Sequence, residues 1–557
     1  MPALEATLCC DENRVTQQFC AALLFEGIVQ PGEPDEEGWQ EWVAGGCRFR
    51  ARASAGAFGR RTLSEGPERK TSSGWTSAGW QDLLAALDLT CGVRDRVHRE
   101  FSRTAINWQS AKACLSQVRR HRLTGAELES AIIEGHPYHP SFKARTGFSD
   151  ADNRAFGPEA ASPFQLEWVL LARDLVESTP GGRLDDPGNS QTCSLGPGLE
   201  KEGFVPFPVH PWQMRQLYRD ATFSDWIAAG RAVCLGPLGD RYRATQSVRT
   251  LMNVDRPAGD HVKLSLAIGN TSSLRTLDPD CVLIASTISN WLEEVVAADS
   301  FLADTSGLTI LREHSGAIAG RGSSLAPGSL AMIRRVSPDA VGIAPDAILP
   351  FNALPLMERD GRPLIDPWVA RFGLMNWFER LVDVAVLPVW HLMLAHGIGI
   401  EAHAQNLLLR HENGWPTGLV ARDFHESLEY VPELLPRPGL APDLGALDPA
   451  FRSAERGRFH AMAGPEDLRE LVMDTLFIYN LADLTACLER AYGLSEKVAW
   501  ARIRKRLDAH VHRYGLEERA ALFCADAPRI ATESLVSRTL FPGRDSYHHL
   551  VPNALAR

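Results

Sequence analysis

Apolar and polar residues follow two different periods along this chain, which indicates that it contains both helices and strands. Apolar side chains recur every three to four positions over residues 14–28, 281–297 and 373–396, the spacing that a helix requires. The last of these stretches is apolar nearly all round, so we expect that helix to be buried. Residues 262–268 alternate in part between apolar and polar side chains and predict a strand.

The pattern also divides the chain along its length. The first 125 residues predict a mixed, mainly helical region, and the middle third, about 126–372, is richer in strands and turns. Residues 180–198 are rich in Gly, Pro and Ser and predict a loop. Gly397 and Gly399 predict the end of the long helix, and a hairpin follows over 406–421 with its turn at 412–414. Beyond about residue 450 the pattern predicts helices to the end.

Length and composition exclude several classes of protein. A chain of 557 residues suggests three or four structural units, at roughly 150 residues each. The net charge of −11 argues against nucleic acid or an anionic membrane as the main partner. Eleven cysteines without a Cys-x-x-Cys pair argue against a disulfide scaffold and favour reduced thiols. The N-terminus lacks a signal-peptide pattern, so we expect a cytoplasmic protein that does not span a membrane.

The first candidate for chemistry is the segment 134–147. It holds two His-Pro pairs, which favour extended backbone because the residue before proline avoids the helical region. His136, His139, Lys143 and Arg145 fall within ten residues of one another. Such a loop could hold anionic oxygens, and it could equally be an ordinary surface loop.

The second candidate is the segment 241–275, which is basic in an acidic protein. It contains six basic residues against two acids. Ser247 and Arg249 are two positions apart, which places them on one face of a strand, and Lys263 alternates with Ser265 on the next predicted strand. A turn of small residues that includes Thr271 then ends in Arg275. Arginine binds carboxylate or phosphate through two parallel hydrogen bonds. The alternative is a basic strand face in solvent.

The third candidate surrounds the predicted hairpin. Glu401, His403 and Gln405 alternate with alanines, so in extended backbone all three side chains share one face. Asn406 begins the hairpin and Asp423 follows it, so these two residues should converge. Converging oxygen ligands suit Mg²⁺ bound together with phosphates, and the order of residues resembles the catalytic loop of kinase-like phosphotransferases. The alternative is a structural network of buried polar groups.

Common nucleotide-binding and hydrolase motifs are missing from the sequence. It contains no Gly-x-x-x-x-Gly-Lys-Ser/Thr loop, no Gly-x-Gly-x-x-Gly after a strand, no Gly-x-Ser-x-Gly and no His-Glu-x-x-His. Phosphate chemistry would therefore use a less common scaffold.

Five motifs, taken in order over residues 134–425, resemble the IucA/IucC family, the siderophore synthetases that work without a nonribosomal peptide synthetase. The motifs are Glu134-Gly-His-Pro-x-His-Pro-x-x-Lys-x-Arg-x-Gly147, His210-Pro-Trp-Gln213, Ser247-x-Arg-Thr250, Lys263 with Thr271-x-x-x-Arg275-Thr, and Glu401-x-His-x-Gln-Asn406. The first 125 residues and the last hundred match more loosely.

The resemblance implies an α+β fold in three parts, arranged like a cupped hand. Residues 1–125 would form a helical thumb, 126–372 β-rich fingers that bind nucleotide and carboxylate, and 373–557 a mostly helical palm with the kinase-like hairpin. The palm also resembles a ferric-siderophore reductase domain, which binds an iron–sulfur cluster through cysteines. Only Cys487 and Cys524 lie beyond residue 281, so we expect no cluster here.

The resemblance also implies a reaction in two steps. A carboxylate, often citrate or a derivative, attacks the α-phosphate of ATP in the presence of Mg²⁺, and an amine, hydroxylamine or alcohol then displaces AMP. Carried over residue by residue, the catalytic group comprises His139, Lys263, Arg275 and His403. The nucleotide would contact Lys143, Ser247, Arg249, Thr271, Gln405, Asn406 and Asp423. The metal would be held by Glu401, Asn406 and Asp423.

Two other functions remain open at this point. A kinase-like phosphotransferase would release ADP in place of AMP and pyrophosphate, and a siderophore-binding or iron-handling protein would consume no ATP. The sequence does not identify the acid, the nucleophile, the stereochemistry, or whether the acid is free or half-made. It also leaves the oligomeric state open, although a homodimer is common in the family that it resembles.

Overall fold

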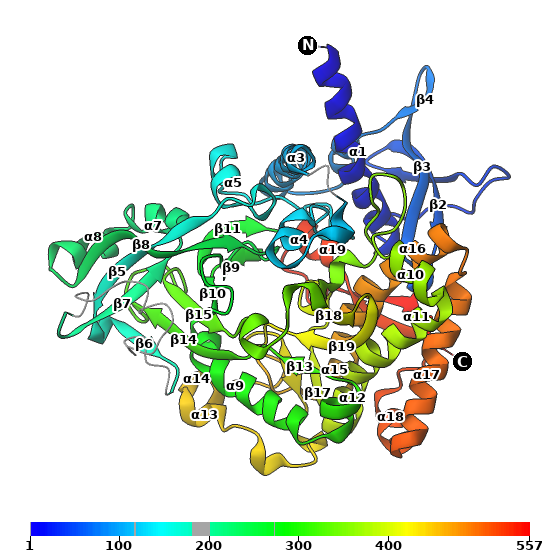
Figure 1. The fold of residues 1–557 in the computed structure, drawn as a ribbon. Helices are drawn as coiled ribbons and strands as arrows, with labels where there is room; N and C mark the ends of the chain where they lie inside the picture. The colour runs from blue at the N-terminus through cyan, green and yellow to red at the C-terminus, as the bar shows by residue number, and fades with distance from the viewer. Residues whose placement is uncertain (1, 116–118, 181–200, 272, 557) are drawn as a thin grey trace.

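The structure is a computed structural model that describes residues 2–115, 119–180, 201–271 and 273–556, with side chains from residue 13 onward. The loop predicted at 180–198 lies almost entirely outside the described residues. The chain is a mixture of helices and sheets, as the two periods in the sequence predict (Figure 1).

The N-terminal region combines a long helix with a four-stranded antiparallel sheet. Helix α1 (Pro2–Phe25) confirms the helix expected at 14–28, and it ends three residues earlier. The sheet has the order β1-β2-β3-β4, over Gln40–Ala44, Cys47–Ala55, Arg61–Thr71 and Gly74–Ser77. Helices α2 (Trp80–Ala85), α3 (Cys91–Cys114) and α4 (Gly125–Ala131) follow. The expectation of a mainly helical region missed this sheet, although β2 alternates apolar and basic residues and buries Phe49 and Ala51 on one face; β3 carries charged residues on both faces.

An eight-stranded antiparallel sheet forms the middle of the molecule. Its order is β6-β14-β15-β10-β9-β8-β5-β7. In chain order these strands are β5 (Phe164–Ala172), β6 (Val176–Ser178), β7 (Phe204–Val209), β8 (Ala232–Ala244), β9 (Thr250–Asn253), β10 (His261–Leu264), β14 (Glu313–Ala319) and β15 (Ala331–Arg335). Around it lie α5 (Asp150–Phe156), α7 (Pro211–Leu217), α8 (Ala221–Ala228) and α9 (Pro279–Ala297). Helix α9 confirms the helix expected at 281–297.

The strand expected at 262–268 is two strands in two different sheets. It breaks at Ser265 into β10 and β11 (Leu266–Asn270), and β11 pairs with β12 (Ser273–Arg275) instead of joining the large sheet. The alternation of apolar and polar residues does not reveal this break, because the break depends on a contact with a distant segment. The hydroxyl of Ser265 donates a hydrogen bond to the carbonyl of Gly328. The break matters for the site, since it brings Arg275 back toward Lys263.

The long apolar helix expected at 373–396 is present and buried. It consists of α11 (Leu374–Leu381), a π-helical turn (Val382–Val386) and α12 (Leu387–His396), and Gly397 ends it with φ +64°. The π turn lies directly before Pro388, whose ring nitrogen cannot donate a helical hydrogen bond. Helix α10 (Asp366–Phe372) precedes it.

The expected hairpin follows the helix. It consists of β18 (Leu407–Glu412) and β19 (Trp415–Ala421), and its turn residues Asn413 and Gly414 both have positive φ, as a tight hairpin turn requires. The flanking strands are β13 (Thr309–Ile310) beside β19 and β16 (Ile348–Pro350) beside β18. Strands β17 (Ile398–Ile400) and β20 (Leu428–Tyr430) pair next to them.

The C-terminal region is mostly helical, but it is not helical to its end. Its helices are α13 (Leu444–Leu447), α14 (Pro449–Arg452), α15 (Pro465–Val472), α16 (Ala482–Tyr492), α17 (Glu496–Tyr514), α18 (Glu517–Phe523) and α19 (Leu535–Leu540). Strands β21 (Arg529–Glu533) and β22 (His548–Pro552) form a final hairpin that the sequence pattern missed. One continuous run, Pro465–Tyr492, is long and apolar enough to cross a membrane, but 78% of its apolar window is buried within the fold, as in a core helix.

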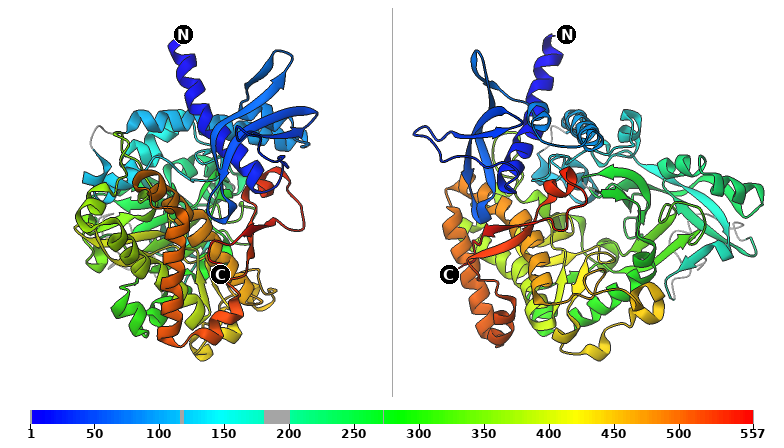
Figure 2. Two further views of the ribbon diagram at one scale, coloured as in Figure 1. Left: turned by 90° about the vertical axis from the view of Figure 1, so that its right-hand side faces the viewer. Right: turned by 180° about the vertical axis from the view of Figure 1, so that it is seen from behind.

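The two ends of the chain share one hydrophobic core. The largest cluster of buried apolar residues joins the N-terminal helices to the helices after residue 374, whereas the eight-stranded sheet has a smaller core of its own. Glu26 shows the connection: its carboxylate accepts hydrogen bonds from the Tyr138 hydroxyl and from the backbone N–H groups of Val536 and Ser537. Figure 2 shows the N-terminal and C-terminal segments side by side in both views.

Candidate active site

A cavity of about 310 Å³ lies where the eight-stranded sheet faces the β18–β19 hairpin. Polar and charged side chains line it. They are Ser247, Arg249, Lys263, Arg275, Glu401, His403, Gln405, Asn406, Asp423, His425, Glu426 and Ser427. The first nine of these are residues that the sequence nominated, and they come from two segments more than 120 positions apart.

Ser247 and Arg249 reach the cavity from a turn, and not from a strand as their spacing predicted. The turn joins β8 to β9, and Val248 between them has φ +68°, which a β-branched residue rarely adopts. The Ser247 hydroxyl accepts the backbone N–H of Thr250 at 3.0 Å. The Arg249 guanidinium lies 3.7 Å from the carboxylate of Glu426. The turn therefore holds both side chains at the cavity by a strained backbone.

Lys263 and Arg275 supply positive charge deeper in the site. Lys263 is on β10 and is buried. Arg275 is on β12, where its Nη2 donates to the backbone carbonyl of Asn270 at 3.1 Å. Its Nε is buried and has no hydrogen-bond partner among the residues that the structure describes. Burial, and then the neighbouring Arg249, lower the pKa of Arg275 to about 10, so it stays protonated at neutral pH. A buried cation with a free donor is suited to an anionic ligand.

On the opposite wall, residues 403–406 form a turn, so that 401–406 is not the single extended segment that the alternation predicted. The N–H of Asn406 donates to the carbonyl of His403 at 2.9 Å, and the N–H of Gln405 donates to His403 Nδ1 at 3.2 Å. The side chains of Glu401, His403 and Gln405 all line the cavity nonetheless. The amide of Asn406 donates to the Glu401 carboxylate at 3.2 Å, which fixes two oxygen-bearing side chains together.

Asp423 joins the two walls. The hairpin brings it beside Asn406, since the N–H of Arg422 donates to the carbonyl of Asn406 at 3.1 Å. Its Oδ1 lies 2.8 Å from Lys263 Nζ and 2.8 Å from Arg335 Nη1, and its backbone has φ +68°. Burial raises the pKa of this carboxyl, but Arg335 and Lys263 outweigh burial and hold it well below its usual range. Asp423 is therefore ionised at any physiological pH.

A second buried carboxylate, Glu313 at the start of β14, positions the residues after Asp423. One of its oxygens accepts the backbone N–H groups of Phe424 and His425 at 2.9 and 3.0 Å. The other lies 3.0 Å from the His425 ring nitrogen Nδ1. Sequence analysis missed Glu313, Arg335 and His425. The sequence could have nominated His425, because it lies two positions after Asp423. No local pattern links Glu313 or Arg335 to Asp423.

Three residues that the sequence nominated lie away from the cavity lining. Lys143 is buried and forms an ion pair with Glu159, which also accepts both terminal nitrogens of Arg145 at 2.7 and 2.8 Å. His139 is buried, accepts the N–H of Ser141 on Nδ1, and has its pKa lowered by burial to about 4.

The third is Thr271, which occupies the turn between β11 and β12 with φ +58°. In the segment 134–147, His139 and Lys143 are thus buried and do not line the cavity. His136 is the member of that segment that lies near His403 and Arg275, and burial together with these neighbours lowers its pKa well below the usual value.

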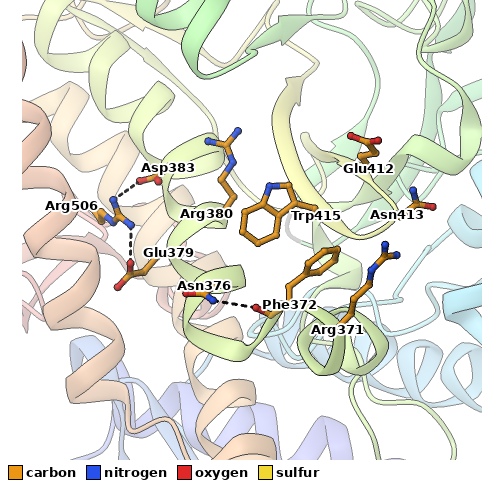
Figure 3. Close-up of a pocket in the computed structure, with 10 residues that line it drawn as sticks. All are labelled: Arg371, Phe372, Asn376, Glu379, Arg380, Asp383, Glu412, Asn413, Trp415 and Arg506. Carbon is orange, nitrogen blue, oxygen red and sulfur yellow. Dashed lines mark hydrogen bonds and ion pairs between the residues drawn. The ribbon is translucent and has the colours of Figure 1, made fainter.

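A larger cavity of about 740 Å³ lies on the outer side of the hairpin (Figure 3). The Phe372 and Trp415 rings lie 5.1 Å apart at its centre, and Arg506 lies 2.7 Å from Glu379 and 3.6 Å from Asp383. None of the residues that line it belongs to a motif quoted above. The smaller cavity, in contrast, is lined by nine of the residues that the sequence nominated. We therefore assign the chemistry to the smaller cavity.

Comparisons with known proteins match nearly the whole length of the chain. The model of the IucA/IucC family matches residues 124–355, and the model described as ferric iron reductase FhuF-like transporter matches residues 375–547. A citryl-spermidine/3,4-dihydroxybenzoyl-citryl-spermidine:spermidine ligase of Bacillus anthracis is 35% identical over 98% of this chain and 93% of its own length.

Two further comparisons also cover nearly the whole chain. A Staphylococcus aureus 2-[(L-alanin-3-ylcarbamoyl)methyl]-3-(2-aminoethylcarbamoyl)-2-hydroxypropanoate synthase is 27% identical over 98% of this chain and 92% of its own length. The crystal structure of the petrobactin biosynthesis protein AsbB from Bacillus anthracis superposes with a TM-score of 0.90, at 30% identity, over 98% of this chain and 95% of that one. The mixed helix and sheet fold is thus the fold of the siderophore synthetases.

The buried pair of Lys143 and Glu159 generates a prediction that separates a supporting role from a ligand-binding role. Lys143→Met should lower the free energy of unfolding by roughly 1–3 kcal/mol, because Glu159 loses one of two charged partners in a buried site. ATP affinity of the folded protein should change less than about twofold. Urea unfolding and calorimetric titration measure the two quantities, with the exposed Lys505→Met as a control. Unchanged stability with a large loss of ATP affinity would contradict the supporting role.

Proposed function

Because the chain belongs to the IucA/IucC family, we propose that it is an ATP-dependent siderophore synthetase that activates a carboxylic acid of the citrate type as its adenylate and joins it to an amine. The relatives named above are ligases and synthases of siderophore biosynthesis, and the chain is an enzyme of the same kind. Within this proposal the large sheet and the hairpin region act as the fingers and palm of a cupped hand. The cytoplasmic location and a homodimeric state stay predictions.

The observation that carries the proposal is the convergence of three cations and several oxygen-bearing side chains on one cavity. Arg249, Lys263 and Arg275 face it from the sheet, and Glu401 and Asp423 face it from the hairpin. Adenylation brings a carboxylate against a triphosphate, so two anions must approach each other. Fixed cations offset that repulsion and the charge that builds at phosphorus in the transition state. A cavity with one basic wall meets this requirement.

The oxygen-bearing wall fits a magnesium ion. Glu401, Asn406 and Asp423 offer hard oxygen donors, and the low pKa of Asp423 keeps it ionised, as such a ligand must be. When bound, Mg²⁺ would neutralise charge on the phosphates of ATP. These three residues are the ones that we propose to hold it.

The chemistry needs no covalent intermediate on the protein. The Ser247 hydroxyl lies 2.8 Å from the hydroxyl of Thr250, without a histidine partner among the described residues, so it is not activated as a nucleophile. A substrate carboxylate oxygen instead forms a bond to the α-phosphorus, and pyrophosphate leaves. The amine nitrogen then forms a bond to the acyl carbon, and AMP leaves with the oxygen that had attacked.

His403 is better suited to donating a hydrogen bond to an anionic oxygen in the first step than to removing a proton from the amine in the second. Its Nδ1 accepts the N–H of Gln405, which places the proton of the neutral ring on Nε2 at the cavity. His403 is therefore a donor toward anionic oxygen in this arrangement. His139 is buried and does not line the cavity, so we do not assign the proton transfer to it.

The incoming amine has a suitable approach beside Glu401. Glu429 on β20 lies close to Glu401, Asp467 and Glu470, and burial followed by these three neighbours raises its pKa to about 8. The Glu429 side chain makes no hydrogen bond or ion pair within the described part of the chain. With a pKa of about 8, Glu429 is largely protonated at neutral pH, and a cationic amine bound beside it would favour its ionised form. We therefore propose that the amine binds beside Glu429.

The hairpin also resembles that of kinase-like phosphotransferases, so the products decide between the two reactions. With a carboxylic acid labelled by ¹⁸O at the carboxylate, one labelled oxygen should appear in AMP, together with pyrophosphate. Mass spectrometry of the nucleotides checks this. Label in inorganic phosphate together with ADP would show attack at the γ-phosphate and would reject adenylation.

Arg275 should be required for adenylation. Arg275→Ala should lower the rate of acid-dependent pyrophosphate exchange by about 10²–10³, because it removes a fixed cation from the transition state. Arg241, exposed and paired with Asp255 at 2.6 Å, offers a matched control, and Arg241→Ala should leave exchange unchanged. A folded Arg275→Ala protein with near-normal exchange would remove Arg275 from the site.

Glu429→Gln should affect the second step alone. The KM for a cationic amine should rise about fivefold, because an ion pair at a partly exposed site contributes on the order of 1 kcal/mol. Acid-dependent pyrophosphate exchange should not change. Glu466→Gln, an exposed acid on the neighbouring α15, is the control. An unchanged KM in the Glu429 variant would show that the amine approaches elsewhere.

A further inference from the structure

Two histidines and an aspartate converge away from the cavity, where the end of α9 meets α12 and α17 (Figure 1). Asp299 follows α9, and its Oδ2 lies 3.1 Å from His391 Nε2 and 3.0 Å from His396 Nε2. The other oxygen of the carboxylate accepts the backbone N–H groups of Phe301 and Leu302 at 2.9 and 3.0 Å. The ligand atoms of the three side chains all lie within 4.8 Å of one another.

Both imidazoles are neutral at physiological pH, which is the form that binds a metal ion. Burial is the main cause that lowers the pKa of His391 and of His396, and it outweighs the attraction of Asp299. The nearby Arg437 and Arg519 further oppose protonation of His396. Asp299 has its pKa lowered to about 2: burial raises it, but the backbone N–H of Leu302 and the two histidines outweigh burial. All three groups are therefore in their ligating state.

A fourth residue orients one of these ligands. His391 Nδ1 lies 2.8 Å from His510 Nε2 on α17. With a metal on Nε2, the proton of His391 moves to Nδ1 and donates to His510, which is the outer hydrogen bond that metal-bound histidines normally make. The rings of Phe301 and Tyr514 enclose His391 and His510 at centroid distances of 4.5–5.3 Å. The arrangement is thus rigid.

We propose that Asp299, His391 and His396 bind a divalent transition-metal ion, with Zn²⁺ as the best match. Two imidazole nitrogens and a carboxylate oxygen are a donor set that Zn²⁺ takes, and a water would complete a tetrahedron. Adjacent ligand atoms in such a tetrahedron lie about 3.3 Å apart, close to the 3.0 and 3.1 Å found here. This site lies outside the reaction cavity and is independent of the proposed function.

The ion would connect the segment that follows α9 to helix α12, and helix α17 would support it through His510. Helix α12 ends at His396, five residues before Glu401, and α17 supplies His510. The competing interpretation is a network of hydrogen bonds alone, in which both histidines donate from Nε2 to Asp299. The two interpretations differ in a measurable way, because glutamine can replace the Nε2 donor of histidine but is a poor zinc ligand.

The experiment titrates the metal-free full-length protein with Zn²⁺, and with Co²⁺ as a spectroscopic probe. We expect one Zn²⁺ per chain, visible d–d absorption typical of tetrahedral Co²⁺ without a thiolate band, and a rise in melting temperature on adding Zn²⁺. Mg²⁺ should produce none of these. His510→Ala should weaken Zn²⁺ binding about 10–100-fold, as loss of an outer partner does.

His396→Gln is the decisive variant, and His512→Gln, an exposed histidine on α17, is its matched control. His396→Gln should keep the metal-free melting temperature within a few degrees and lose the Co²⁺ absorption, whereas His512→Gln should keep both. Should His396→Gln not fold, Asp299→Asn serves instead, since its amide oxygen can still accept the N–H groups of Phe301 and Leu302. No Zn²⁺ binding by the parent protein, or binding retained in the ligand variants, would overturn the proposal.

Discussion

The carboxylate of Asp423 holds the two halves of the site together. It lies 2.8 Å from Lys263 on β10 and 2.8 Å from Arg335 on β15, which are neighbouring strands of the large sheet, while its own backbone continues the β18–β19 hairpin. A buried carboxylate requires such partners, since an unpaired charge in this position would cost several kcal/mol. Glu313 reinforces the link from β14 by accepting the N–H groups of the two residues after Asp423. The distance between the basic wall and the oxygen-bearing wall therefore depends on this one cluster.

Strained backbone recurs where the motifs meet this cluster. Val248, Thr271 and Asp423 are residues other than glycine with positive φ, and each lies in a motif or beside the cavity. Such conformations cost on the order of 1–3 kcal/mol and persist only where the surroundings enforce them. Here the surroundings are the hairpin, the β8–β9 turn and the large sheet. The strained turn at Val248 places its neighbours Ser247 and Arg249 at the cavity, and the strained backbone of Asp423 lets its carboxylate reach Lys263 and Arg335.

One wall of the cavity is basic, although the protein as a whole is acidic. The chain carries a net charge of −11, yet its cavity presents Arg249, Lys263 and Arg275 on a single wall. The acids beside which we propose that a cationic amine binds, Glu429 among them, lie close to Glu401 on the opposite wall. The two substrates that we propose, an anion and a cation, thus approach surfaces of opposite sign.

The sequence by itself determined the helices at 14–28, 281–297 and 373–396, the β18–β19 hairpin, and nine of the residues that line the cavity. These rest on local causes: helical periodicity, the turn chemistry of Asn413 and Gly414, and clusters of cations and oxygen donors that few functions require. Only the tertiary structure decided the break of the 262–268 strand at Ser265, and the final hairpin of β21 and β22. It also decided that Lys143 pairs with Glu159 and that Glu313 and Arg335 support Asp423. The physical reason is that an ion pair between residues far apart in the chain has no periodic or local trace, because it depends on which strands become neighbours when the sheet forms.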